Sequence, residues 1–162
     1  MSKIKISLLS GLIGGTLGAS IGAVAYRSSA KKLEKEKKQT EKLVEFYKIL
    51  IQWLSLKQEK KSLVEYFKKN NYKVIAIYGM KELGERLLEE LKGTEIAVKY
   101  AIDKQAEYLL SNIDIVVPNP NLEEVDVIIV TAIHYYDEIE REMSEYVDCP
   151  IVSLEDVIYD LV

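Results

Sequence analysis

The 162-residue chain contains one Cys, one His and three Pro, and its formal net charge is only −4. A single Cys excludes a disulfide scaffold, and Cys149 has no second Cys or His near it in sequence that would complete a metal site or a redox pair. The small net charge is the sum of two unlike parts. Residues 1–61 carry 13 Lys+Arg and 5 Asp+Glu, a net of +8, whereas residues 62–162 carry 9 and 21, a net of −12. A basic front therefore precedes an acidic body, which is unsuited to binding nucleic acid.

Charged residues are absent from residues 6–26, which hold eight Leu, Ile or Val and five Gly. As a helix, this stretch would span roughly 31 Å, about one hydrocarbon core. We expect residues 1–27 to form a single-pass transmembrane anchor of marginal hydrophobicity. A cleaved signal peptide ending at Ala23-Val24-Ala25 is the alternative. Six Lys or Arg in residues 27–38 oppose translocation, which favours an anchor with the C-terminal body in the cytoplasm.

Glycines at four-residue spacing mark this apolar segment. In lipid, such a stripe of small residues allows two helices to approach closely. The pattern predicts a homo-oligomer that associates through Gly11, Gly15, Gly18 and Gly22. A monomeric anchor in which the glycines are incidental is the alternative.

Residues 28–61 are predicted to form a basic helical stalk. Its Lys cluster is suited either to contact anionic headgroups or only to fix the topology. Leu43, Tyr47, Leu50 and Leu54 follow 4-3-4 spacing, and Phe46, Ile49 and Trp53 widen the stripe. The Leu43–Leu54 stretch is therefore an amphipathic helix face that packs on the body or on a second copy of itself.

The acidic body, residues 62–162, alternates apolar runs with helical patterns. Strands are predicted at residues 73–78, 96–102, 113–117, 125–132 and 150–153. Helices are predicted at residues 82–92, 136–146 and 154–161, with a short one after Ser62 that ends at Asn70-Asn71. Near-continuous apolar strands between helices predict an α/β domain, an open parallel sheet of about five strands with helices on both faces.

The stretch from Tyr78 to Gly84 resembles the G-x-G-x-x-G turn of Rossmann dinucleotide-binding domains, with Gly79 first and Gly84 third. Asp103, at the end of the second predicted strand, stands where such domains carry the acidic residue that binds the ribose. Thr131 and His134 follow the fourth strand, at the edge of the sheet that lines the ligand crevice. The resemblance implies a site for NAD(P) or a nucleotide-sugar made of Gly79, Met80, Lys81, Gly84, Asp103, Thr131 and His134.

The second glycine of the motif is replaced by Lys81, whose side chain obstructs the usual approach of the pyrophosphate. Two interpretations follow. In one, Lys81 contacts a phosphate directly and the site accepts a different nucleotide geometry. In the other, the site is degenerate and the fold is retained for packing or for binding a partner.

A catalytic set is missing from the sequence, which has no P-loop, no G-x-S-x-G, no H-E-x-x-H and a single His. The body is also similar to small Rossmann-like domains of bacterial polysaccharide-biosynthesis proteins that act on or near nucleotide-sugars. That resemblance implies polysaccharide-biosynthesis proteins as partners, at a bacterial cell membrane. We expect a non-enzymatic, membrane-anchored accessory or scaffolding protein. The alternatives are a sensor or small enzyme subunit that binds a nucleotide, and a structural oligomer held by the glycine stripe.

Overall fold

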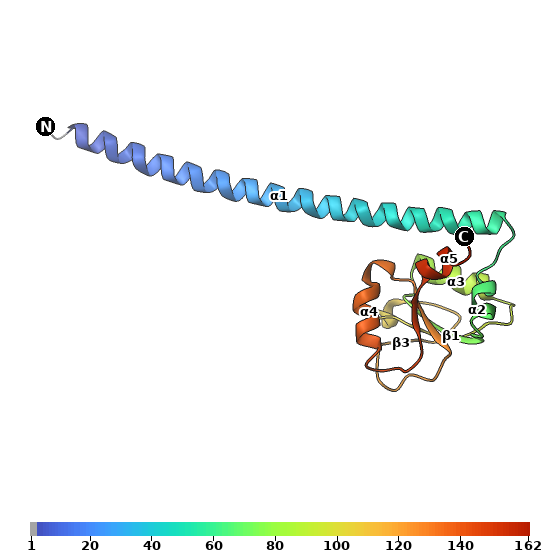
Figure 1. Ribbon diagram of the computed structural model, residues 1–162. Coiled ribbons are helices and arrows are strands. Elements are labelled where there is room, and N and C mark those ends of the chain that lie inside the picture. Colours follow the sequence, from blue (N-terminus) through green and yellow to red (C-terminus); the bar gives the residue numbers. More distant parts are fainter. Residues whose placement is uncertain (1–2) are drawn as a thin grey trace. The chain divides into compact units, whose positions relative to one another are not determined.

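The computed structural model describes the backbone of residues 3–162 and the side chains of residues 29–162. The chain divides into two compact units, Met1–Phe46 and Tyr47–Val162, and helix α1 (Lys3–Gln58) contributes to both (Figure 1). Within the part of the chain whose side chains are described, no helix is long and apolar enough to cross a membrane. The predicted anchor and its glycine stripe lie outside that part and stay predictions.

The second unit is built on a five-stranded, all-parallel sheet. Its strands are β1 (Val74–Tyr78), β2 (Ala97–Ile102), β3 (Ile115–Val116), β4 (Val127–Val130) and β5 (Ile151–Ser153). They lie in the order β3-β2-β1-β4-β5, with Ile77 of β1 between Ala101 of β2 and Ile129 of β4. The predicted α/β class and parallel sheet are confirmed. Chain order reverses between β1 and β4, which makes that junction the switch point of the sheet.

Helices follow the predicted pattern. The regular ones are α2 (Val64–Lys69), α3 (Glu82–Leu91), α4 (Tyr136–Met143) and α5 (Leu154–Tyr159), and two 3-10 turns are η1 (Ala106–Tyr108) and η2 (Ile133–Tyr135). Helix α3 buries Leu83, Leu87 and Leu91, which recur every fourth residue. Ser153 is the N-cap of α5, and its hydroxyl accepts a 3.2 Å hydrogen bond from Glu155 N.

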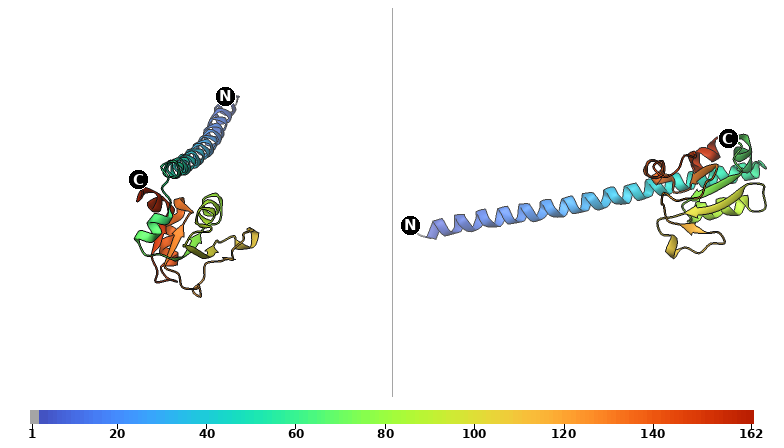
Figure 2. Two further views of the ribbon diagram at one scale, coloured as in Figure 1. Left: turned by 90° about the vertical axis from the view of Figure 1, so that its right-hand side faces the viewer. Right: turned by 90° about the horizontal axis from the view of Figure 1, so that it is seen from below.

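Helices cover both faces of the sheet. The side chains of each strand alternate in direction, so every strand presents side chains to both faces. Tyr78 of β1 and Val130 of β4 point to the same side as Ile139 and Met143 of α4, with which they form one core cluster. The crossover from β1 to β2 through α3 and the crossover from β4 to β5 through α4 run in opposite directions along the sheet, so right-handed connections place these helices on opposite faces. Figure 2 gives two further views of the sheet and the helices beside it.

The β3 side of the sheet has thinner cover. The β2–β3 connection carries only η1, and the β3–β4 connection is an extended loop that contains Pro118 and Pro120. Leu122 of this loop packs against the core cluster that contains Tyr78, Val130 and Met143. Glu123 O accepts a 2.6 Å hydrogen bond from the Tyr100 hydroxyl. A loop therefore takes the place that a crossover helix fills elsewhere in the sheet.

The last turns of α1 belong to the body. Ile49, Trp53 and Leu56 are buried in the second unit, which begins at Tyr47, before the predicted start at residue 62. Of the predicted Leu43–Leu54 face, Ile49 and Trp53 thus pack on the body, whereas Tyr47 and Leu54 are 63% and 52% exposed. The helix has apolar side chains on two sides, and one of them covers the body.

Candidate functional site

The turn after β1 requires a glycine at Gly79. Its φ is +96°, a region that side chains disfavour, and an added Cβ would lie 2.9 Å from Thr131 Oγ1. Gly79 N donates a 2.8 Å hydrogen bond to Ile102 O, so the turn is fastened to the end of β2. The first glycine of the motif is therefore fixed by backbone geometry and close packing.

Gly84, in the first turn of α3, lets that helix pack directly on the β1 turn. A Cβ at Gly84 would overlap the carbonyl oxygen of Gly79 and would lie 3.3 Å from Thr131 Oγ1. This is the helix–strand packing role that the third glycine has in the motif. Gly79 and Gly84 thus pack against each other at the start of α3, and a bound ligand is not needed to explain either residue.

Thr131, the residue after β4, stabilises the same turn. It is buried, and its hydroxyl lies 2.5 Å from Gly79 O and 3.1 Å from Tyr78 O, so it donates to these carbonyls. Thr131 N donates a further 2.9 Å bond to Tyr78 O. We expected Thr131 to face a ligand, but its hydroxyl proton is used inside the protein.

Asp103 is also engaged with the chain's own backbone. It is 8% exposed, and its Oδ2 accepts from Met80 N at 3.1 Å while its Oδ1 accepts from Gln105 N at 2.8 Å. Both carboxylate oxygens thus hold the two loops that follow β1 and β2. The residue stands at the expected end of β2, and its visible role is to join these loops.

The other predicted site residues have different surroundings. Met80 is 3% exposed, so its side chain is part of the core. Lys81 is the N-cap of α3, with an exposed side chain that makes no capping bond. His134 is half-buried in η2. The structure therefore brings Gly79, Gly84, Thr131 and Asp103 together in one closed turn. We call it the glycine turn, and Lys81 lies on its outer surface.

A polar cluster beside this turn was missed by sequence reasoning. Tyr78 is 4% exposed, and its hydroxyl has no hydrogen-bond partner among the described residues. Burial raises the pKa of Tyr78 to about 12, against an opposing effect of the Lys104 charge. Lys104 Nζ lies 2.7 Å from Glu142 Oε2 and 4.0 Å from Glu138 Oε1 on α4. Strand alternation was the one sequence signal here, since it directs Tyr78 toward one face.

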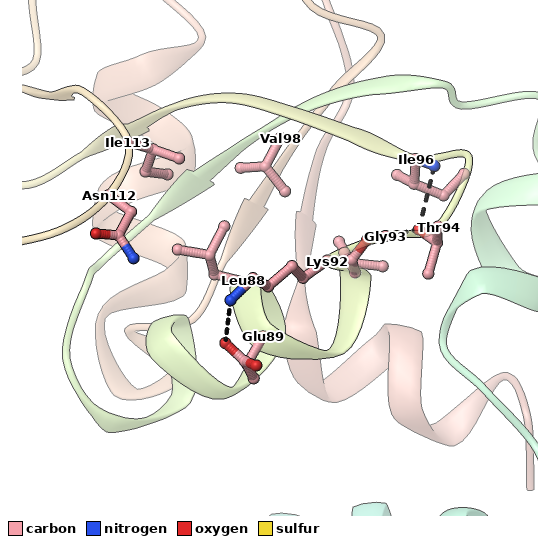
Figure 3. Close-up of a pocket in the computed structure, with 10 residues that line it drawn as sticks. Leu88, Glu89, Lys92, Gly93, Thr94, Ile96, Val98, Asn112 and Ile113 are labelled. Atoms are coloured by element: carbon pink, nitrogen blue, oxygen red, sulfur yellow. Dashed lines mark hydrogen bonds and ion pairs between the residues drawn. The ribbon is translucent and has the colours of Figure 1, made fainter.

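Two pockets lie away from the glycine turn. One has a volume of about 320 Å³ and lies between the end of α3 and the start of β2 (Figure 3). The Glu89–Lys92 ion pair is on its wall, and its apolar lining consists of Leu88, Leu91, Ile96, Val98 and Ile113. The other, of about 180 Å³, adjoins Tyr100 and the β3–β4 loop. Among the described residues, no three His, Cys, Asp or Glu side chains are grouped so as to hold a metal ion.

Comparison with known proteins relates the chain to a family. The family described as C2185-like, N-terminal matches residues 70–150, half of the chain, so the protein belongs to this family. The match covers β1 to β4, the glycine turn and α4. Neither the curated proteins nor the solved structures that were compared contain a match.

Proposed function

We propose that this member of the C2185-like N-terminal family is a membrane-anchored accessory or scaffolding protein, whose Rossmann-like body docks partner proteins at the cytoplasmic face. The observation that carries the proposal is the buried carboxylate of Asp103. Both of its oxygens accept backbone hydrogen bonds from the loops it joins, from Met80 N and Gln105 N. A degenerate nucleotide site, retained for its structural value, is the simplest account of this arrangement.

The energetic argument concerns what a dinucleotide would displace. A ribose that took over the Asp103 carboxylate would compete with hydrogen bonds to a charged acceptor, each contributing about 1.5–3 kcal/mol. The pyrophosphate would also meet the side chain of Lys81 where the motif has glycine. Together these features oppose the usual dinucleotide pose, while the turn keeps its packing role.

Support for the anchor comes from the sequence. A charge-free stretch at residues 6–26 is followed by six Lys or Arg in residues 27–38. The net charge of −12 on residues 62–162 would be repelled by an anionic leaflet, which favours a body held clear of the bilayer. A link to bacterial polysaccharide biosynthesis is supported by the similarity of the body to small Rossmann-like domains of such proteins. Polysaccharide-biosynthesis proteins are therefore the first partners to test.

Calorimetry on the full chain in detergent micelles tests the site. NAD, NADH, NADP, NADPH and UDP-sugars, each at about 1 mM, are expected to give no binding heat, because Lys81 and the hydrogen-bonded Asp103 oppose the dinucleotide pose. At this concentration the measurement detects binding stronger than about −4 kcal/mol, a millimolar Kd. Micromolar binding that is lost in Lys81→Ala would overturn the proposal. Lys81 is exposed, so this variant keeps the fold.

Membrane extraction tests the anchor. The full chain is expected to stay in the membrane fraction at alkaline carbonate pH, and Leu12→Lys with Leu17→Lys is expected to release it. Leu33→Lys, a matched change at an exposed position of the stalk, should leave the protein in the membrane. Release of the unmodified chain would refute the anchor. A protease that cleaves the body from outside intact cells would refute the orientation.

A nucleotide-binding sensor is the second candidate, and one observation favours it. The buried Tyr78 hydroxyl has no hydrogen-bond partner in the described part of the chain, and it lies beside the charged Lys104–Glu142 pair, near the carboxyl ends of β1 and β2. A bound nucleotide that accepted a hydrogen bond from this hydroxyl would satisfy it. Tyr78→Phe would then weaken the calorimetric binding described above, whereas under the first proposal there is no binding to weaken.

A further inference from the structure

The end of α1 carries an apolar stripe on the side that does not cover the body. Within the second unit this seam consists of Tyr47, Ile51 and Leu54, which are 63%, 43% and 52% exposed. Their spacing of four and then three residues is the 3.5-residue repeat of a coiled coil, and three positions earlier in the sequence it reaches Val44. Such a repeat favours a second helix over a flat surface as the partner.

The body leaves this seam open. Ile49 and Leu56, both 1% exposed, are the α1 side chains buried most deeply against the body. Each lies two residues from a seam position, which is a rotation of about 200° around the helix. In heptad terms Ile51 is at a, Tyr47 and Leu54 are at d, and Ile49 and Leu56 are at f, directly opposite. A helix partner can therefore approach the seam without meeting the body.

We infer that this seam pairs with the same seam of a second copy of the chain, as a parallel helix dimer. The parallel direction rests on the proposed anchoring, which brings two chains to the membrane by the same end. In that register, Leu50 of one chain flanks Ser55 of the other, and Leu43 flanks Lys48, so no like charges face each other across these two flanking pairs. Two heptads alone are a short interface, and a shared membrane raises the effective concentration of the two helices.

Mass measurement of the full chain in detergent, by light scattering corrected for the micelle, gives the first test. The chain is expected to be a dimer, and Ile51→Lys with Leu54→Lys is expected to halve the protein mass. Leu110→Lys is the matched control, because Leu110 is fully exposed and lies outside the seam. Fluorescence of the buried Trp53, on the other side of the same helix, verifies that the body is still folded.

A monomeric unmodified chain would overturn the inference and leave the seam to a helix of another protein. A dimer that survives the double Lys variant but is lost in Gly14→Ile with Gly18→Ile would also overturn it, in favour of the glycine stripe. Disulfide formation gives independent evidence. In a Cys149→Ser background, Leu54→Cys should cross-link two chains and Leu110→Cys should not. Carbonate extraction of the same variants reports on anchoring separately, so the two proposals can fail independently.

Discussion

The indole nitrogen of Trp53 donates a 2.6 Å hydrogen bond to Glu90 Oε2, which joins the end of α1 to α3. The other oxygen of this carboxylate accepts from Leu63 N at 2.9 Å and from the Ser62 hydroxyl at 3.1 Å, and it lies 2.6 Å from Lys57 Nζ. The Glu90 side chain is 4% exposed. One carboxylate thus connects α1, α2 and α3 on the same side of the sheet.

Glu90→Ala is expected to lower the free energy of unfolding by about 3 kcal/mol, because it removes a charged acceptor and leaves the Trp53 and Leu63 donors unpaired. Urea unfolding followed by fluorescence of Trp53, the single Trp, measures this directly. The matched control is Glu89→Ala, whose exposed side chain makes only a 3.7 Å ion pair with Lys92. Its cost should be below about 0.5 kcal/mol. Equal losses in the two variants would contradict the role given to Glu90.

Gly84→Ala is expected to destabilise the body by about 2–3 kcal/mol, because the new methyl group would overlap the Gly79 carbonyl. In an unobstructed helix the same change would stabilise by about 1 kcal/mol, so even the sign distinguishes the two cases. Gly93→Ala is the control. Nothing lies within 4 Å of its Cβ, and its φ of +75° leaves only backbone strain. Thermal unfolding monitored by circular dichroism compares the two, and a stabilised Gly84→Ala would rule out the close packing.

Tyr78→Phe and Tyr100→Phe should have opposite effects. The Tyr78 hydroxyl is buried and has no partner among residues 29–162, whose side chains are described, so its removal is expected to be neutral or to stabilise by up to about 1 kcal/mol. The Tyr100 hydroxyl donates a 2.6 Å bond to Glu123 O, and its loss should cost about 1 kcal/mol. Chemical denaturation of both variants is the measurement. A destabilised Tyr78→Phe would mean that its hydroxyl has a partner in solution, such as a bound water or ligand.

The contribution of Asp126 to stability should depend on pH. Hydrogen bonds from Val74 N and Lys73 N, at 2.8 and 2.7 Å, hold the pKa of its carboxyl below the ordinary value of 3.8. A depressed pKa in the folded state stabilises the fold above pH 3.8, and that contribution is lost as the pH falls through the folded-state pKa.

Comparing the unmodified chain with Asp126→Asn from pH 7 down to pH 2 tests this. The difference in unfolding free energy should be constant at neutral pH and should shrink once the pH is below about 4. Glu124→Gln, at an exposed neighbouring position, is the control for a general loss of negative charge. A difference that stays constant down to pH 2 would show that the carboxylate charge has no part in holding β1.

The fold was predictable because each strand is a short apolar run and each helix has its own repeat. The interactions that close the glycine turn were not. Asp103 reaches Met80 N, 23 residues away, only because β1 and β2 pair side by side. Lys104 likewise forms its hydrogen bond with Glu142 across 38 residues.

The apolar periodicity along α1 was ambiguous for another reason. The helix is apolar on two sides, and only the packing of Ile49 and Trp53 reveals which side meets the body.

The shortness of β3 has a consequence for solubility. An edge strand offers unpaired backbone groups to any other chain, and long, flat edges promote aggregation. Here that edge is two residues long, Ile115–Val116, and Pro118, two residues beyond its end, has no N–H to offer. The incomplete side of the sheet thus exposes little backbone for a foreign strand to extend, which protects a domain that lacks the usual covering helix there.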